Sequence, residues 1–302
     1  MTPRNDIPKM HKIKKVVQEH KNKGYDFLKL ADNLPKNNYL TLLQQSQLYG
    51  VTVIGHAQRN LPLEFSTRMK SIEHVEEFLY LKDETTQKSF VEADSNELNQ
   101  IALTLKNSGL YIGTTLSVFE FINDCLDDER FAAFKEIKLA KYLHRDQRDD
   151  FLSEKNDYRK LKNQMFGDQT AKQLFANQFS WMKLFTNILY KNDVKLLTGS
   201  DTYGMVIVGF SLHREFELLQ EAGMRPYDIL VASTINPARY LNTFAMEGTI
   251  SEGKNANLVL LSKNPLLDIR NTQTIEGVMI KGKWLDRQTL NKMLDEVEIA
   301  YK

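Results

Sequence analysis

Four residues able to bind a metal or move a proton lie at the ends of apolar stretches. These residues are Lys29, His56, His74 and Asp201. Short apolar runs of this kind are typical of strands buried in a parallel sheet, and the carboxyl ends of such strands form the active-site face of a β/α barrel. Imidazole nitrogens and a carboxylate suit a divalent transition metal. The shared position at strand ends therefore predicts that the four side chains meet around one cation.

Each of the four residues also has an ordinary structural explanation. A buried histidine is usually a hydrogen-bonded core residue, and a lone lysine usually makes an ion pair. Asp201 could cap the following helix, because aspartate is favoured at that position. The metal-site interpretation depends on the four residues being taken together.

Strand-like and helix-like segments alternate along the first 244 residues. Apolar and β-branched runs predict strands near residues 25–30, 51–54, 71–74, 110–115 and 194–198. Strands separated by helices are typical of an α/β fold with a parallel sheet. A closed barrel of this kind has eight strands, so the five predicted strands indicate a partial (β/α)8 barrel.

Two regions depart from this alternation. The connection at about 116–193 is far longer than usual and rich in charge, which predicts a helical excursion that is either a solvated appendage or a lid over the site. Beyond residue 244 the pattern changes to short strands and a closing helix. The predicted domains are therefore a barrel over 1–244 and a C-terminal β-rich segment over 245–302.

Composition narrows the class of protein. The 302 residues include 40 Lys and Arg against 39 Asp and Glu, a net charge of +1, which argues against a nucleic-acid partner. No stretch approaches the about 20 apolar residues of a membrane helix. The first residues lack the apolar core of a secretory signal, so a cytoplasmic location is the default expectation. Cys125 is the one cysteine, which excludes a disulfide within the chain.

Several stretches resemble the metal-dependent amidohydrolase superfamily, in particular its imidazolonepropionase-like and prolidase-like branch. They span nearly the whole chain in family order. The last of them, Gly-Thr-Ile-Ser-Glu-Gly-Lys-Asn-Ala-Asn-Leu-Val, is highly specific. The stretches are residues 25–29, 53–57, 71–74, 197–201, 211–215, 232–239 and 248–259.

The resemblance implies roles for the four residues. It also implies that the five predicted strands correspond to the fourth to eighth strands of the family's eight-stranded barrel. Lys29 resembles the lysine that is carboxylated and bridges two metals, and His56 and His74 resemble ligands of the second metal. Asp201 resembles the residue that binds metal and shuttles the proton. His213 lies in a matching stretch and is expected to pack or to support the site.

The implied function is that of a metal-dependent amidohydrolase acting on a small-molecule substrate. A metal-activated hydroxide would cleave a C–N bond in a non-peptide amide, a lactam or a dipeptide-like compound. Zinc is the default metal. The same ligand set would also allow a lactonase or a deaminase, because fold does not fix substrate.

The sequence departs from the family pattern at its start. The family holds its first metal with a His-x-His pair after the first strand, and this chain contains no such pair. We therefore expect an N-terminally incomplete chain that binds at most one metal instead of two. The alternative is a catalytically incompetent remnant. Open sheet edges invite pairing with other chains, so we also expect poor solubility or a homo-oligomer.

Overall fold

The computed structural model describes residues 10–81, 90–202 and 206–301. The chain divides into two units. The first contains Met1–Gly113 and Ile188–Leu196, and the second contains Thr114–Asn187 and Leu197–Lys302. None of the helices in the described ranges combines the length and apolar character needed to cross a membrane.

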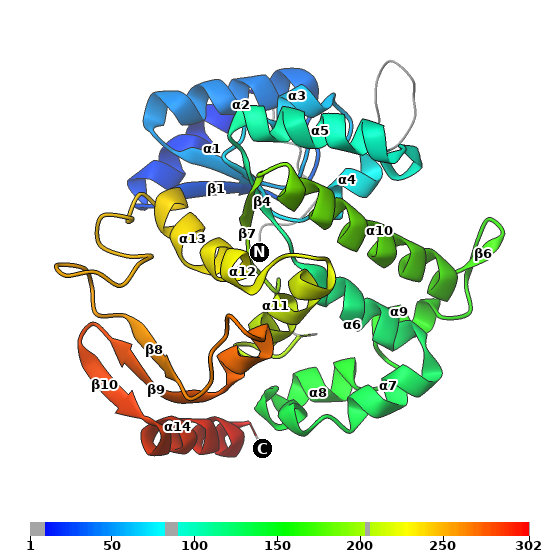
Figure 1. Ribbon diagram of the computed structural model, residues 1–302. Coiled ribbons are helices and arrows are strands. Elements are labelled where there is room, and N and C mark those ends of the chain that lie inside the picture. Colours follow the sequence, from blue (N-terminus) through cyan, green and yellow to red (C-terminus); the bar gives the residue numbers. More distant parts are fainter. Residues whose placement is uncertain (1–9, 82–89, 203–205, 302) are drawn as a thin grey trace. The chain divides into compact units, whose positions relative to one another are not determined.

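A five-stranded sheet forms the centre of the first unit (Figure 1). Its order is β1-β2-β3-β4-β7, so the strands follow one another in chain order, and the pairs β1/β2, β2/β3 and β3/β4 are parallel. The strands are β1 (Phe27–Leu30), β2 (Thr52–Gly55), β3 (Ser71–Ile72), β4 (Tyr111–Gly113) and β7 (Lys195–Leu197). This arrangement confirms the predicted α/β fold with a partial (β/α)8 barrel.

Helices connect the strands of this sheet. α1 packs against α2, and its apolar residues Ile13 and Val17 are buried. α2 ends where Gly50 adopts a left-handed conformation, and α5 begins with a capping box between Asp94 and Glu97. The helical segments are α1 (Met10–Asn22), α2 (Lys36–Tyr49), α3 (Leu63–Ser66), α4 (Glu77–Tyr80), η1 (Phe90–Glu92) and α5 (Ser95–Ser108).

Close strand packing requires glycine at position 55. Gly55 ends β2 with a φ of +123°, and a Cβ at this position would overlap the backbone of Leu30 in β1. We expect Gly55→Ala to lower the free energy of unfolding by about 3 kcal/mol, because strain and a backbone clash add. Gly24 has a φ of +78° and open space around it, so Gly24→Ala should cost only about 1 kcal/mol. Urea unfolding measures the stability of both variants. Equal losses of unfolding free energy in Gly55→Ala and Gly24→Ala would contradict the clash with Leu30.

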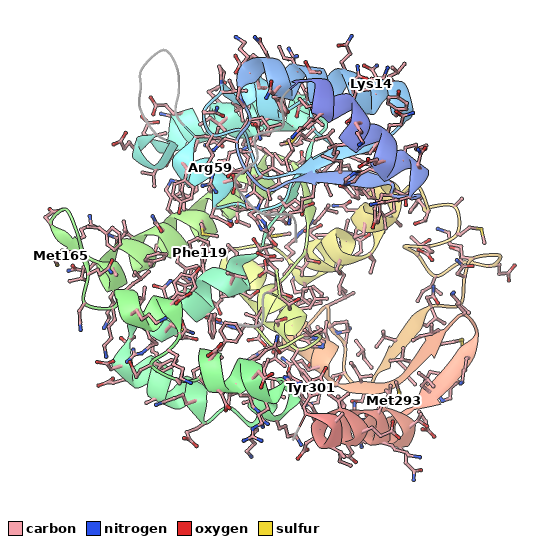
Figure 2. All side chains as sticks on the ribbon, turned by 180° about the vertical axis from the view of Figure 1, so that it is seen from behind. Lys14, Arg59, Phe119, Met165, Met293 and Tyr301 are labelled. Carbon is pink, nitrogen blue, oxygen red and sulfur yellow. The ribbon has the colours of Figure 1, made fainter. Side chains whose placement is uncertain are left out.

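The segment predicted as a helical excursion is built from several short helices and one long helix. We expected one charged helical region over about 127–191, but Gly167, with a φ of +65°, allows a β5–β6 hairpin to interrupt it. Figure 2 labels Met165 in this hairpin. The elements are α6 (Leu116–Leu126), α7 (Asp128–Lys135), η2 (Lys138–Tyr142), α8 (Arg145–Phe151), α9 (Asp157–Leu161), β5 (Met165–Phe166), β6 (Gln169–Thr170) and α10 (Ala171–Lys191).

The C-terminal part of the second unit contains the predicted β-rich segment. Three antiparallel strands form a sheet in the order β10-β9-β8, and a closing helix follows. The domain boundary near residue 244 stays a prediction. The elements are α11 (Ser211–Glu221), α12 (Pro226–Ser233), α13 (Ile235–Tyr240), β8 (Leu258–Leu261), η3 (Ile269–Gln273), β9 (Ile275–Ile280), β10 (Lys283–Asp286) and α14 (Arg287–Ala300).

Candidate functional site

Three of the four predicted site residues lie at the carboxyl ends of neighbouring strands in the first unit. Lys29 is in β1, His56 directly follows β2, and His74 lies two residues beyond β3. The His56 backbone N–H donates to the carbonyl oxygen of Leu30 at 2.8 Å, which fixes the end of β2 against β1. The His56 and His74 rings lie edge to face with centroids 4.9 Å apart. The sheet therefore brings the two imidazoles side by side.

A buried carboxylate holds His56 in place. Glu77, at the start of α4, is completely buried, and one of its oxygens lies 2.7 Å from His56 Nδ1. Arg59 donates to both oxygens of the same carboxylate, with 2.9 Å between its Nε and Oε2. Because an ionised carboxylate only accepts hydrogen bonds, Nδ1 of His56 carries a hydrogen, which leaves Nε2 as the ring nitrogen that could bind a metal.

Hydrogen bonds keep Glu77 ionised in spite of its burial. Burial alone would raise the pKa of this carboxyl, but the hydrogen bonds from His56 and Arg59 outweigh it and lower the pKa below its usual value. Arg59 also stacks over the Tyr80 ring, with its Cζ 4.4 Å from the ring centroid. The anion that orients His56 is therefore itself fixed from two sides.

Lys29 of β1 pairs with an acid that directly follows β3, two strands away in the sheet. Its Nζ lies 3.1 Å from Oε2 of Glu73, and the Lys29 side chain is 45% exposed. This is the ion pair of an unmodified lysine, and the carboxylation of Lys29 stays a prediction. His74 is buried, with its Nδ1 4.0 Å from Oε1 of Glu76.

Gln58 joins the loops that follow β1 and β2. It is completely buried, its Oε1 accepts from the Leu34 N–H at 2.8 Å, and its Nε2 donates to the carbonyl oxygen of Asp32 at 3.3 Å. The Arg59 N–H donates to the Asn33 side chain at 2.6 Å. The loop that carries Arg59 is thus held directly beside the end of β1.

Asp201 belongs to the second unit, where it lies in an irregular segment after β7. It is exposed and has a φ of +41°, in the left-handed region. Thr115, which follows β4, is a second left-handed residue, with a φ of +48°. A β-branched residue rarely adopts this conformation, and strained residues cluster at functional sites. The ends of β4 and β7 are joined by a hydrogen bond of 3.1 Å from the Thr114 N–H to the Leu197 oxygen.

A second buried carboxylate supports the turn around Thr115. Glu215 in α11 is completely buried and accepts from Thr114 Oγ1 at 2.5 Å, from the Leu116 N–H at 3.0 Å and from the Ser117 N–H at 2.7 Å. The two N–H groups belong to the first turn of α6, which favours a negative charge. His213 of the same helix packs on η3, with its Nδ1 2.9 Å from Thr272 Oγ1.

No complete cluster of metal ligands is present in the described residues. Three or more His, Cys, Asp or Glu side chains do not converge on a common point anywhere in those ranges. The donors that converge in the first unit are the two imidazoles, with Lys29 in the adjacent strand. The predicted metal, its identity and the number of ions therefore stay predictions.

Nearly the whole chain matches one family of known proteins. A sequence model of the amidohydrolase family matches residues 3–285. The chain belongs to this family. No curated protein sequence matches this chain significantly.

Solved structures of other amidohydrolases share the fold. The bottromycin amidohydrolase has a TM-score of 0.70 and 19% identity, with 97% of this chain and 63% of that one covered. A Xaa-Pro dipeptidase with bound methionine has a TM-score of 0.61 and 17% identity, with 92% and 59% covered. A putative prolidase from Bifidobacterium longum has a TM-score of 0.57 and 19% identity, with 95% and 64% covered. The chain thus spans less than two thirds of the length of these proteins.

Sequence reasoning missed the two buried carboxylates of this amidohydrolase. Glu77 is directly followed by the apolar residues Phe78 and Leu79. A charged residue beside apolar residues can indicate a buried group that is paired with an opposite charge. Glu215 lies four residues from both Ser211 and Leu219, which places it on the buried face of its helix. Arg59 carries no comparable signal, because its role depends on Glu77.

Proposed function

We propose that this chain binds a divalent metal through His56 and His74, with Lys29 as a further ligand, and hydrolyses a C–N bond of a small molecule. The observation that supports the proposal most strongly is the pair of adjacent imidazoles with Glu77 behind His56. Carboxylate–histidine pairs of this kind orient the ring of a metal-binding histidine and raise its basicity.

The donor set fits the metal. The Nδ1 atom of His56 is bound to Glu77, so Nε2 is the nitrogen left to bind the metal. His74 comes from the next strand of the sheet, and its ring lies 4.9 Å away. Neutral imidazole and carboxylate oxygen suit zinc and its neighbours in the first transition series. Zinc is therefore the metal that we propose.

Hydrolysis would divide the chemistry between the metal and the protein. When bound, a divalent metal polarises a carbonyl group and lowers the pKa of water to about 7. The family resemblance assigns the proton transfer to Asp201, whose carboxylate would accept a proton from the attacking water and donate it to the leaving nitrogen; hydrolysis of the C–N bond would give a carboxylic acid and an amine. His56, held by Glu77, keeps its Nε2 aimed at the site. Lys29 would supply a carbamate ligand if its amine lost a proton and added carbon dioxide, as the family resemblance implies.

The substrate class follows from the family and from the names of the relatives. Those names include a Xaa-Pro dipeptidase, a prolidase and the bottromycin amidohydrolase. We infer a small amide, lactam or dipeptide-like compound as the substrate of this chain.

Zinc titration of the purified chain tests the site, and hydrolysis assays test the activity. We expect His74→Ala to weaken zinc binding at least tenfold, because it removes a ligand. His20→Ala is the matched control, since His20 lies in α1, before the first strand, and bonds the Val16 carbonyl oxygen of that helix. Unchanged zinc affinity in His74→Ala would reject the metal site.

Turnover is measured separately on a panel of Xaa-Pro dipeptides and N-acyl amino acids with added zinc. Release of amine that depends on zinc and on Asp201 supports the proposed reaction. Zinc binding without turnover of any compound would keep the metal site and reject hydrolysis by this chain.

A further inference from the structure

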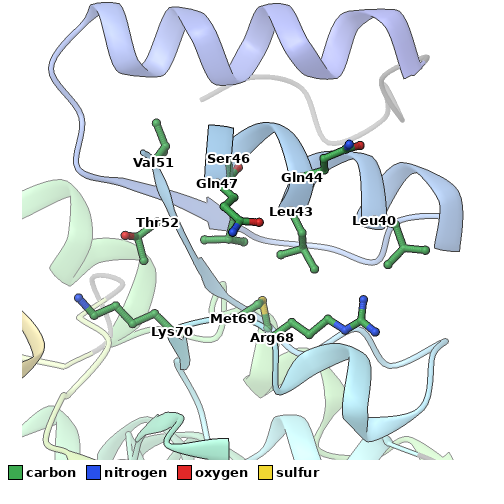
Figure 3. Close-up of a pocket in the computed structure, with 11 residues that line it drawn as sticks. Leu40, Leu43, Gln44, Ser46, Gln47, Val51, Thr52, Arg68, Met69 and Lys70 are labelled. Atoms are coloured by element: carbon green, nitrogen blue, oxygen red, sulfur yellow. The ribbon is translucent and has the colours of Figure 1, made fainter. Parts of the chain in front are cut away.

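A hollow of about 570 Å³ opens on the first unit beside α2 (Figure 3). It lies between this helix and the segment that leads into β3. Residues at the start of β2 form part of its wall, whereas His56 follows the other end of that strand. The hollow is therefore separate from the candidate metal site. Its lining consists of Leu40, Leu43, Gln44, Ser46, Gln47, Val51, Thr52, Val53, Arg68, Met69 and Lys70.

The hollow exists because one connecting helix is short. α3 has four residues, about 6 Å of helix, against 14 residues and about 21 Å for α2. α3 is tied to the first turns of α2, where the Tyr39 hydroxyl donates to the Phe65 oxygen at 2.7 Å. Beyond that tie, Leu40, Leu43 and Gln47 form a stripe at helical spacing that lines the open space.

The lining is positively charged and contains no acid. Arg68 and Lys70 are its two charged residues, and they extend toward opposite ends of the hollow (Figure 3). In the ranges that the structure describes, no carboxylate lies in ion-pair range of Arg68. Lys70 Nζ lies 5.4 Å from the Phe27 ring centroid, and burial lowers its pKa. Arg68 Cζ lies 5.2 Å from the centroid of the Phe65 ring, and its side chain is exposed. An apolar wall with an exposed guanidinium that has no carboxylate partner in those ranges favours a ligand of opposite charge.

Ser46 lies in the wall of the hollow but offers it no polar group. The residue is 2% exposed, and its hydroxyl oxygen is closed to solvent and has no hydrogen-bond partner among the described residues. The hollow thus combines largely apolar walls with a cation at its edge.

We propose that this hollow binds a small organic carboxylate with an apolar body. The carboxylate contacts Arg68, and the apolar body lies on Leu40, Leu43 and Met69. This would be a second ligand site, at the opposite end of β2 from the candidate active site. The proposal does not depend on the proposed hydrolysis.

Octanoate is a suitable probe because it combines a carboxylate with an apolar chain. We expect calorimetric titration to show octanoate binding, with octanol and octylamine at least fivefold weaker, because only octanoate matches the charge of Arg68. Arg68→Gln should weaken octanoate binding at least fivefold. Leu43→Gln should weaken it to a similar extent by making the wall polar.

Lys106→Gln is the matched control. Lys106 is a cation of the same unit that pairs with Asp193 at 3.0 Å and lies outside the hollow. Its replacement should leave octanoate binding unchanged. Octanol or octylamine binding as tightly as octanoate would overturn the proposal, as would equal affinities in wild type and Arg68→Gln. Because Arg68 is exposed, its variant tests binding without a loss of the fold.

Discussion

Glu215→Ala is expected to lower the free energy of unfolding by about 4 kcal/mol, which is exceptional for one residue. Glu215 is completely buried, and three donors point at its carboxylate. Without it, the N–H groups of Leu116 and Ser117 and the hydroxyl of Thr114 lose their acceptor inside the protein. Each such group costs about 1–3 kcal/mol when it is left without a partner.

Urea unfolding of three variants measures the effect. Glu215→Gln keeps one oxygen as an acceptor, so we expect about half of the loss seen for Glu215→Ala. Glu221→Ala is the control on the same helix, since Glu221 is 45% exposed and pairs with Arg214 at 3.0 Å. Exposed pairs contribute about 0–1 kcal/mol. Equal losses for Glu215→Ala and Glu221→Ala would contradict the role of the buried carboxylate.

The effect also depends on pH. Burial raises the pKa of Glu215 above its usual 4.5, against the lowering by the hydrogen bonds from Thr114, Ser117 and Leu116. A raised pKa in the folded state means that folding favours the protonated form. The stability that comes from this shift is present below pH 4.5 and is lost as the pH rises through the folded-state pKa. We therefore expect wild type to gain stability relative to Glu215→Gln as the solution is acidified.

The positions of the strands could be predicted because the apolar character of their residues indicates burial and their β-branched side chains favour an extended backbone. Val51-Thr52-Val53-Ile54 is apolar and β-branched, and β2 forms at Thr52–Gly55. The same reasoning could place His56 and His74 at strand ends, because parallel strands present their carboxyl ends on one face. The distance between the His56 and His74 rings depends on the order of the strands in the sheet. The alternation of strands and helices in the sequence also indicated that order.

The long connection was less predictable, because its stability comes from contacts between distant segments. Arg159 in α9 is 3% exposed in its side chain and bonds Asp128 at 2.6 Å, Glu154 at 3.0 Å and the Cys125 oxygen at 2.8 Å. Read from the sequence, Asp128, Glu154 and Arg159 are surface charges of a helical region. Only the folded chain shows that a buried guanidinium joins the ends of several short helices.

Replacing Glu77 should weaken zinc binding more than any other change outside the proposed ligands. Glu77→Gln keeps an oxygen near His56 but loses the negative charge that fixes Nδ1–H and raises the basicity of Nε2. Substitutions of this kind typically reduce metal affinity 10–100-fold, and we expect a loss of about 30-fold in a zinc titration. Glu64→Gln, at an exposed position of α3, should leave the affinity unchanged.

Stability should change as well, with a defined dependence on pH. The carboxyl of Glu77 has a pKa below its usual 4.5, because the hydrogen bonds from His56 and Arg59 outweigh the effect of burial. A lowered pKa in the folded state stabilises the protein above pH 4.5, and this stabilisation is lost as the pH falls through the folded-state pKa. Wild type should therefore lose stability in acid relative to Glu77→Gln, which cannot titrate at this position.

Arg59→Gln separates the positioning of His56 from the stability of the fold. This variant leaves Glu77 buried with His56 as its remaining partner, so it should destabilise the protein by about 3 kcal/mol, as removal of one member of a buried ion pair does. The 2.7 Å contact between Glu77 and His56 remains, and we expect the zinc affinity to fall less than threefold. If Arg59→Gln and Glu77→Gln reduced zinc affinity equally, Glu77 would act only through the stability of its loop. A large loss for Glu77→Gln alone assigns it to the orientation of His56, because only that variant changes the group bound to Nδ1.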